Sequence, residues 1–138
     1  MNLNHDLLRN RCREISDSVD RLEKIGLMSK VAFLKDQDIK DIACYRLLIA
    51  IEAALSICYH ISAKHLKKTP ENYADCFHLI GEAGIIPVML AGNLQRMARF
   101  RNLLVHVYWD VDEEMLFEIV STHLGDLRKY CEAVVRLL

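Results

Sequence analysis

The stretch CYRLLIAIEAALSICYHISA, residues 44–63, decides the fold of this chain. It is the most apolar part of the sequence, but Arg46 and Glu52 interrupt it, and a charged side chain at the centre of a bilayer is costly. We therefore expect a buried central helix and no membrane-spanning segment. Its apolar density predicts contact with neighbouring helices on more than one side.

The sequence on the amino-terminal side of this stretch predicts one long amphipathic helix. Apolar residues recur at three- and four-residue intervals over residues 7–25, and Gly26 follows them as a helix stop signal. A polar link at residues 35–38 then precedes the central helix, and either Asp36 or Asp38 is suited to cap it. The chain is therefore expected to begin with two long helices joined by a polar link.

The sequence on the carboxyl-terminal side predicts a short helix and two long ones. A polar loop covers residues 67–72, Gly84 ends the short helix that follows, and Pro87 stands in the first turn of the next. Asp110 and Glu113 form a cap-like pair before the last helix. We expect an all-α protein, an antiparallel four-helix bundle with an extra short helix. The predicted helices cover residues 5–25, 39–65, 73–83, 88–109 and 111–138.

The composition is that of an ordinary globular chain. With 138 residues, five Gly and two Pro, we expect a single domain over residues 1–138, built from long helices. The net charge of −1 argues against a protein that coats nucleic acid through many phosphate contacts, but it allows a small basic site. The amino terminus shows no apolar signal segment after a basic start, so we expect a cytoplasmic protein.

Cysteine and histidine usage predicts neither disulfides nor a metal site. The five Cys lack C-x-x-C spacing and most stand among apolar neighbours, so we expect buried reduced thiols. His78 and His123 are not spaced from Cys or carboxylates as metal ligands are, and we expect no metal and no cofactor. The cysteines are Cys12, Cys44, Cys58, Cys76 and Cys131.

A second informative stretch is RNLLVHVY, residues 101–108, at the end of a predicted helix. It places a fixed cation (Arg101), an amide (Asn102), a titratable imidazole (His106) and a phenol (Tyr108) close together. These groups are suited to phosphate chemistry. Taken one at a time, the arginine is also typical of a solvated surface charge, and the histidine of a capping or packing residue near a helix end.

On an ideal helix the polar groups of this stretch face away from the predicted core. Asn102, His106 and Trp109 share one arc, and Ala91 and Ala98 lie along the same stripe. Small residues permit close approach of another helix, and an exposed tryptophan is uncommon. The stripe therefore predicts a second subunit that covers it.

The spacing of the arginine and the histidine also favours two subunits. Arg101 and His106 are five residues apart and point in directions that differ by roughly 140° on one regular helix. We therefore expect a homodimer, in which the two copies bring these side chains together in a composite cleft. Spacing alone does not decide whether Arg99 or Arg101 serves there.

Residues 101–108 resemble the R-x4-6-H signature of the HEPN superfamily, in the R-x4-H-x-Y form typical of HepT toxins. Arg101, His106 and Tyr108 match this form without a gap, and a polar residue directly after the arginine, here Asn102, is usual in that family. The resemblance implies a dimeric HEPN fold and an RNA-cleaving toxin. It also implies a partner antitoxin, an MntA-like nucleotidyltransferase that transfers AMP from ATP onto the motif tyrosine, here Tyr108.

The expected reaction is metal-independent RNA cleavage, in which a ribose 2′-OH attacks the adjacent phosphate. His106 is the expected acid/base, and Arg101 is expected to hold the phosphate. Asn102, one helical turn before His106, is expected to orient the imidazole or a phosphate oxygen. An AMP group on Tyr108 would bring negative charge and bulk into a cleft meant for phosphates. Two alternatives stay open: a non-catalytic dimeric HEPN module that binds a nucleotide or the antitoxin, and a substrate-binding accessory of a larger nucleotidyltransferase.

Overall fold

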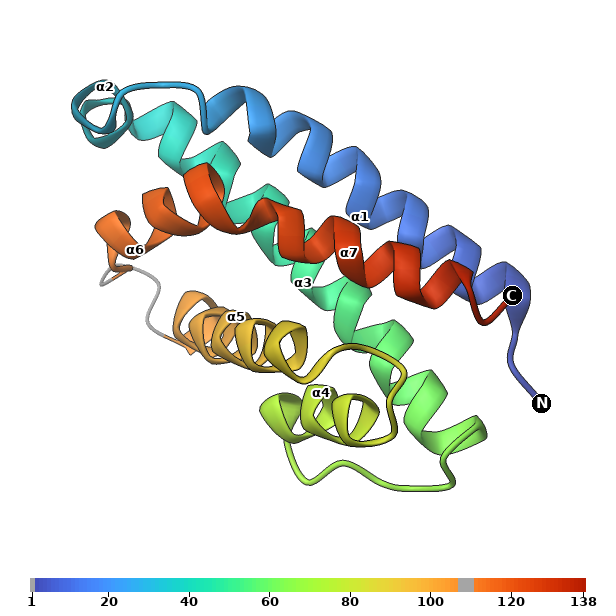
Figure 1. Cartoon of the computed structure of the whole chain (residues 1–138). Coiled ribbons are helices and arrows are strands. Elements are labelled where there is room, and N and C mark those ends of the chain that lie inside the picture. Colours follow the sequence, from blue (N-terminus) through green and yellow to red (C-terminus); the bar gives the residue numbers. More distant parts are fainter. Residues whose placement is uncertain (1, 107–110) are drawn as a thin grey trace.

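The computed structural model describes residues 2–106 and 111–138, except for the side chains of residues 105 and 106. Over that part of the chain every regular element is helical, and the predicted all-α fold is confirmed. Long helices form the bundle, and shorter helical segments lie between them (Figure 1). The elements are α1 (His5–Ile25), α2 (Lys30–Lys35), α3 (Gln37–Lys64), α4 (Tyr73–Glu82), α5 (Val88–His106), α6 (Glu113–Glu118), the π-helical segment η1 (Ile119–His123) and α7 (Leu124–Val135).

The helix α3 is the centre of the fold. Its Leu47, Ile57 and Ile61 have no exposed surface, so the prediction of a buried central helix is confirmed. The helix α1 packs along α3 and α7, whereas α4 and α5 pack on each other and complete the bundle from the other side (Figure 1). By length and composition α3 is also able to span a membrane, a property that it shares with core helices of globular proteins.

Capping side chains set the ends of the first helices. Asn4 caps α1, whose bounds agree with the predicted range 5–25. Asp36, rather than Asp38, caps α3, because its Oδ1 accepts a hydrogen bond from the Ile39 N–H at 3.1 Å. The first N–H groups of α3 have no partner within the helix, and Asp36 accepts from one of them. The polar link therefore ends at Asp36.

Two parts of the chain differ from the sequence prediction. The sequence pattern does not predict α2, because six residues are too few to show a helical period. The last helical stretch begins with α6, a little later than predicted, and its N-cap is Asp112 rather than Asp110, which lies outside the described residues. The Asp112 Oδ1 accepts from the Met115 N–H at 3.0 Å, and Lys40 of α3 holds the same turn through a 2.7 Å ion pair with Glu113.

The predicted last helix is also interrupted by η1. In this segment the Thr122 hydroxyl donates to the Glu118 carbonyl at 2.5 Å. Gly26, at the end of α1, approaches η1 so closely that a Cβ at this position would lie 2.5 Å from the Val120 carbonyl oxygen. A glycine is needed here for close packing, whereas its φ of −64° is open to any residue.

The prediction of an outward-facing stripe of small residues on α5 is wrong. Ala91 and Ala98 are 4% and 0% exposed and pack inside the monomer. A Cβ at Gly81 of α4 would lie 2.7 Å from the Ala91 Cβ, so α4 and α5 approach closely there. The small residues therefore admit α4 of the same chain. Trp109 lies outside the described residues.

The prediction that the cysteines are reduced is wrong for one pair. Cys58 of α3 and Cys76 of α4 form a disulfide, with their Cα atoms 6.0 Å apart. Both residues have no exposed surface. The pair is 18 residues apart in sequence, and it is the packing of α4 on α3 that brings the two together. Cys12, Cys44 and Cys131 are free thiols.

Candidate functional site

Arg101 lies where three helices meet. It stands on α5, and its side chain is 12% exposed and reaches towards α3 and α4. Its Nε donates to the Glu52 carboxylate of α3 in an ion pair, and its Cζ lies 4.5 Å from the ring centroid of Tyr73 of α4. The guanidinium is thus held by a carboxylate at one edge and by an aromatic ring on one face. We call these three side chains the Arg101 cage.

The cage leaves the Nη atoms of the guanidinium without a carboxylate partner among the described residues. Glu52 takes the Nε proton, and the Nη1 atom of Arg101 donates to the Asn102 Oδ1 at 3.3 Å. Among the described residues no acceptor pairs with Nη2. The two Nη atoms form the fork with which arginine binds two oxygens of one phosphate. A partner at Nε and a stacked ring restrict the rotation of that fork without covering it.

Tyr73 is itself held in place by a second ring. Tyr59 of α3 meets it edge to face, with the ring centroids 6.1 Å apart. Burial raises the pKa of the Tyr59 phenol, and the nearby Tyr73 and the Asp75 carboxylate raise it further. Tyr59 therefore stays neutral at physiological pH and serves as a packing ring behind Tyr73.

The rest of the predicted site is only partly described. Asn102 follows Arg101 on α5 and accepts a hydrogen bond from it, and its supporting role towards the imidazole or the phosphate stays a prediction. The helix is described as far as His106, whose side chain lies outside the described part of the structure. Tyr108 lies wholly outside the described residues. The roles of His106 and Tyr108 stay predictions.

The sequence prediction misses two members of the Arg101 cage. Glu52 carries a signal that points to it, because a carboxylate in an apolar central helix needs a cationic partner. Tyr73 carries no such signal, since its contact depends on how α4 packs. The structure also separates the two candidate arginines: Arg101 is held by neighbours from three helices, whereas Arg99 is exposed.

The comparisons with known proteins place the chain in a family. A family model described as ribonuclease HepT-like matches residues 15–134. The chain belongs to this family. The mRNA nuclease HepT of Shewanella oneidensis is 25% identical over 131 residues, which cover 94% of this chain and 97% of that protein. A putative RNase of Archaeoglobus fulgidus is 31% identical over 94 residues, which cover 68% of this chain and 70% of that protein.

The solved structures show the same fold. The tri-AMPylated HEPN toxin of Shewanella oneidensis, solved in complex with an MNT antitoxin, matches this HepT-like chain with a TM-score of 0.85 and 25% identity, over 100% of both chains. The HEPN fold implied by residues 101–108 is therefore confirmed. The described part of the motif, residues 101–106, forms the carboxyl-terminal end of α5 and begins with the arginine of the Arg101 cage.

Proposed function

We propose that this HepT-like protein is the endoribonuclease toxin of a toxin–antitoxin pair, and that it cleaves RNA without a metal ion. The observation that carries the proposal is the Arg101 cage, which holds the motif arginine at its Nε and on one face and leaves Nη2 without an acceptor among the described residues. The ribonuclease family and the mRNA nuclease relative support the nuclease activity. In this proposal residues 1–138 form one HEPN domain that works in the cytoplasm.

The proposed reaction is an internal transfer at phosphorus. The ribose 2′-oxygen attacks the adjacent phosphorus, and the bond from phosphorus to the 5′-oxygen of the next nucleotide breaks. A neutral His106 imidazole accepts the 2′-OH proton, and a protonated one supplies the proton to the departing 5′-oxygen. Arg101 binds the non-bridging oxygens, where negative charge develops. The products are a 2′,3′-cyclic phosphate and a 5′-hydroxyl end.

The proposed catalytic unit is a homodimer. Arg101 and His106 point roughly 140° apart on a regular helix, so one copy of α5 does not present both to the same phosphate. Arg99, Asn102 and Leu103 lie on the same side of α5 as the expected direction of His106, and Leu103 is 53% exposed. We call these three residues the α5 ridge. A twofold axis that sets two ridges face to face forms a cleft with two arginines and two histidines.

The proposed partner is an MntA-like nucleotidyltransferase that attaches AMP to Tyr108. The support for this step is the tri-AMPylated HEPN toxin found with an MNT antitoxin. Tyr108 stands two residues after His106 in the motif, and a phosphate attached there adds negative charge near Arg101. That charge competes with the RNA phosphate for the same guanidinium, so the modification is expected to stop cleavage.

Purified protein incubated with single-stranded RNA in EDTA tests the proposal. Wild-type protein is expected to give fragments with 2′,3′-cyclic phosphate ends, and His106→Ala is expected to lose about 10²–10⁴-fold in rate. His78→Ala, which changes an exposed histidine paired with Glu82, is the matched control and is expected to cleave normally. Cleavage by His106→Ala at the wild-type rate would remove the proposed mechanism.

The same chain made with and without a candidate nucleotidyltransferase tests the partner. Intact-protein mass spectrometry is expected to show added AMP only after co-expression, and Tyr108→Phe is expected to abolish the addition. Light scattering measures the oligomeric state of the unmodified chain, which is expected to be a dimer. A monomer that cleaves RNA at full rate would contradict the composite cleft.

One observation favours a second candidate function, a non-catalytic dimeric HEPN module. The Arg101 guanidinium already has a carboxylate partner in Glu52, which is also what a purely structural arginine shows. Such a module would bind a nucleotide or the nucleotidyltransferase through the same surface. It predicts stable binding of RNA or antitoxin with no cleavage in EDTA or in Mg²⁺, and the cleavage assay separates the two candidates.

A further inference from the structure

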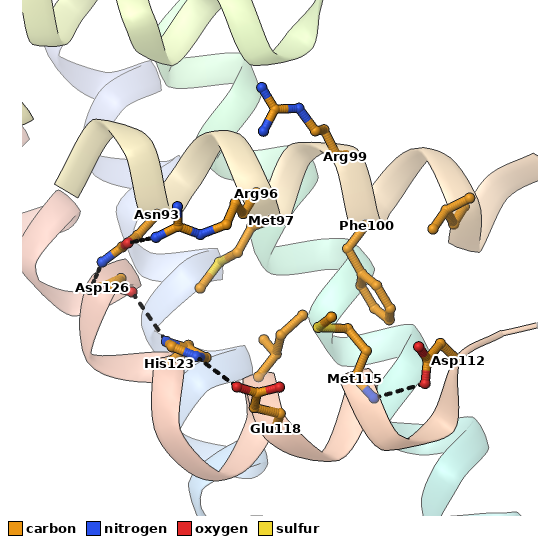
Figure 2. A pocket seen from close by; sticks show the side chains of 12 residues that line it. Asn93, Arg96, Met97, Arg99, Phe100, Asp112, Met115, Glu118, His123 and Asp126 are labelled. Atoms are coloured by element: carbon orange, nitrogen blue, oxygen red, sulfur yellow. Dashed lines mark hydrogen bonds and ion pairs between the residues drawn. The ribbon is translucent and has the colours of Figure 1, made fainter. Parts of the chain in front are cut away.

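A cavity of about 370 Å³ opens on the other flank of α5, between this helix and the α6–η1–α7 stretch (Figure 2). Its floor consists of Met97, Phe100 and Ile119, which are 3–5% exposed. Leu103 and Met115 stand at its mouth and are 53% and 42% exposed. A volume of this size is typical of small-ligand sites, which combine apolar walls with a few polar groups. We call this space the α5–η1 cavity.

One end of the cavity carries a chain of connected polar side chains (Figure 2). Arg96 donates to the Asn93 Oδ1, and the Asn93 Nδ2 donates to the Asp126 Oδ1 at 3.4 Å. The two ring nitrogens of His123 each lie 3.8 Å from a carboxylate oxygen, Nδ1 from Asp126 and Nε2 from Glu118. Asp126 is largely enclosed, with 13% of its side chain exposed. The cavity therefore offers oriented acceptors beside an apolar floor.

The wall that carries His123 is built by η1. A π-helical segment inside an α-helix is rare and is frequently found at functional sites, and its wider turn redirects the side chains around it. Here it places His123 between carboxylates from either side of the segment, Glu118 and Asp126. The close approach of Gly26 to the Val120 carbonyl accommodates this wider turn. An uncommon element, η1, thus forms one wall of the cavity.

The lining matches a nucleobase better than a phosphate. Phe100 supplies an aromatic surface, and Met97 and Met115 supply thioethers that pack well against aromatic rings. The charged lining residues comprise three carboxylates, Asp112, Glu118 and Asp126, and two arginines, Arg96 and Arg99, so the lining as a whole does not favour an anion. Carboxylate and amide oxygens accept hydrogen bonds from the exocyclic amino groups of adenine, cytosine and guanine, which uracil lacks.

We propose that the α5–η1 cavity binds one base of the RNA and prefers bases with an exocyclic amino group. This inference rests on the proposed function, because it gives the ribonuclease a subsite next to the cleaved bond. Phe100 directly precedes Arg101 on α5, so the floor of the cavity and the Arg101 cage are adjacent along the helix. Phe100 and Arg101 point about 100° apart, so they lie on different flanks of a helix about 10–12 Å wide.

The α5 ridge lies between the Arg101 cage and the mouth of the α5–η1 cavity. Arg99 is also one of the residues that line the cavity, but its side chain extends away from those of Met115 and His123 in Figure 2. An RNA strand that lies in the cleft between the two ridges meets this exposed cation with its backbone, while one base enters the cavity past Leu103. The RNA phosphate then lies outside the cavity, and the base lies inside it. The phosphate of a nucleotide is thus bound at the α5 ridge, and its base is bound in the α5–η1 cavity.

Methionine methyl signals offer a direct test, because two of the five methionines, Met97 and Met115, line the cavity. Protein labelled with ¹³C at the methionine methyl groups is titrated with AMP, GMP, CMP and UMP and followed by NMR. The Met97 and Met115 signals are expected to move with the first three nucleotides and much less with UMP. The Met28 and Met89 signals serve as internal references and are expected to stay in place.

Matched variants at exposed methionines complete the test. Met115→Asp adds a charge at the mouth and is expected to abolish the Met97 shift and to raise KM for RNA roughly tenfold with kcat kept. Met89→Asp makes the same substitution at an 80% exposed position on α5 outside the cavity and is expected to change neither. The proposal is overturned if the Met97 signal of the wild type does not move, or if it moves as much with UMP as with the other nucleotides. It is also overturned if the Met97 signal still moves in Met115→Asp.

The outcome is independent of whether the protein proves to be a nuclease. Mononucleotide binding needs no cleavage, and the Arg101→Ala variant is expected to keep the methyl shifts while losing RNA cleavage. Absence of cleavage by wild-type protein counts against the proposed function alone. Absence of methyl shifts in a protein that cleaves RNA counts against the base subsite alone.

Discussion

The two flanks of α5 are built in opposite ways. On the flank that meets α3 and α4, Arg101 is 12% exposed and has partners on both neighbouring helices. On the flank that meets η1, the side chains leave a cavity of about 370 Å³, and Leu103 at its mouth is 53% exposed. One helix therefore presents a fixed cation on one side and an open apolar space on the other.

The difference between the flanks matches what each has to do in the proposed reaction. A group that stabilises charge in a transition state acts best when it is already in place, so close packing around Arg101 is an advantage. A subsite that receives a base has to stay accessible, so packing there has to be incomplete. The following predictions test whether the flanks differ in function as they do in packing.

Among the described side chains of the two flanks, the largest effect is expected at Arg101. Arg101→Ala removes the fork that meets the phosphate, and we expect kcat/KM for RNA to fall about 10²–10³-fold. Arg128→Ala is the matched control, because Arg128 of α7 is also paired with carboxylates, Asp20 and Glu23 of α1, away from both flanks of α5. Rates come from a quenched fluorescent RNA under single-turnover conditions. Equal losses in the two variants would mean that cleavage responds only to general destabilisation.

A smaller effect is expected at Glu52, which positions Arg101 and does not meet the RNA. Glu52→Ala frees the guanidinium to rotate, and we expect kcat to fall about tenfold with a smaller change in KM. Glu52→Gln keeps an oxygen that accepts from Nε, so most of kcat is expected to return. A faster Glu52→Ala enzyme would contradict this role, because it would show that the carboxylate competes with the phosphate for Arg101.

The sequence predicts the helices of this protein better than it predicts the surroundings of its site. The bounds of α1 and the capping region of α3 follow from local apolar periodicity and from Asp and Asn side chains, which act within one turn. The segments α2 and η1 do not follow in this way, because one is shorter than a useful period and the other keeps the apolar pattern of an α-helix.

The contacts around the motif depend on tertiary packing, and there the sequence is less informative. Arg101 is recognised from its motif, but its partners Glu52 and Tyr73 are far from it in sequence and come from two other helices. Ala91 and Ala98 are small and buried, and small residues of this kind indicate that another helix approaches α5 closely. They do not indicate which helix that is. At Ala91 the helix that approaches is α4 of the same chain.

Gly81 and Gly125 differ in how closely they are packed, and this difference predicts opposite effects when each is replaced by alanine. Gly81→Ala adds a methyl group that meets the Ala91 Cβ at 2.7 Å, and overpacking of this kind costs about 1–3 kcal/mol, partly offset by the better helix propensity of alanine. Gly125→Ala on α7 meets nothing within 4 Å and is expected to stabilise the fold by about 0.5–1 kcal/mol. Urea unfolding measures both. A stabilised Gly81→Ala variant would show that α4 moves away easily.

The smallest effect is expected at Tyr73, because a cation–π contact at a partly exposed site is worth about 0.5–1 kcal/mol. Tyr73→Leu keeps apolar bulk but loses the aromatic face against the Arg101 guanidinium, and we expect kcat/KM to fall by a factor of about 2–5. Tyr73→Phe keeps the ring, its contact with Tyr59 and its position over Arg101, so it is expected to retain the wild-type rate. If the phenylalanine variant loses as much as the leucine variant, the hydroxyl rather than the ring is what matters, and Tyr73 then acts on the RNA rather than on Arg101.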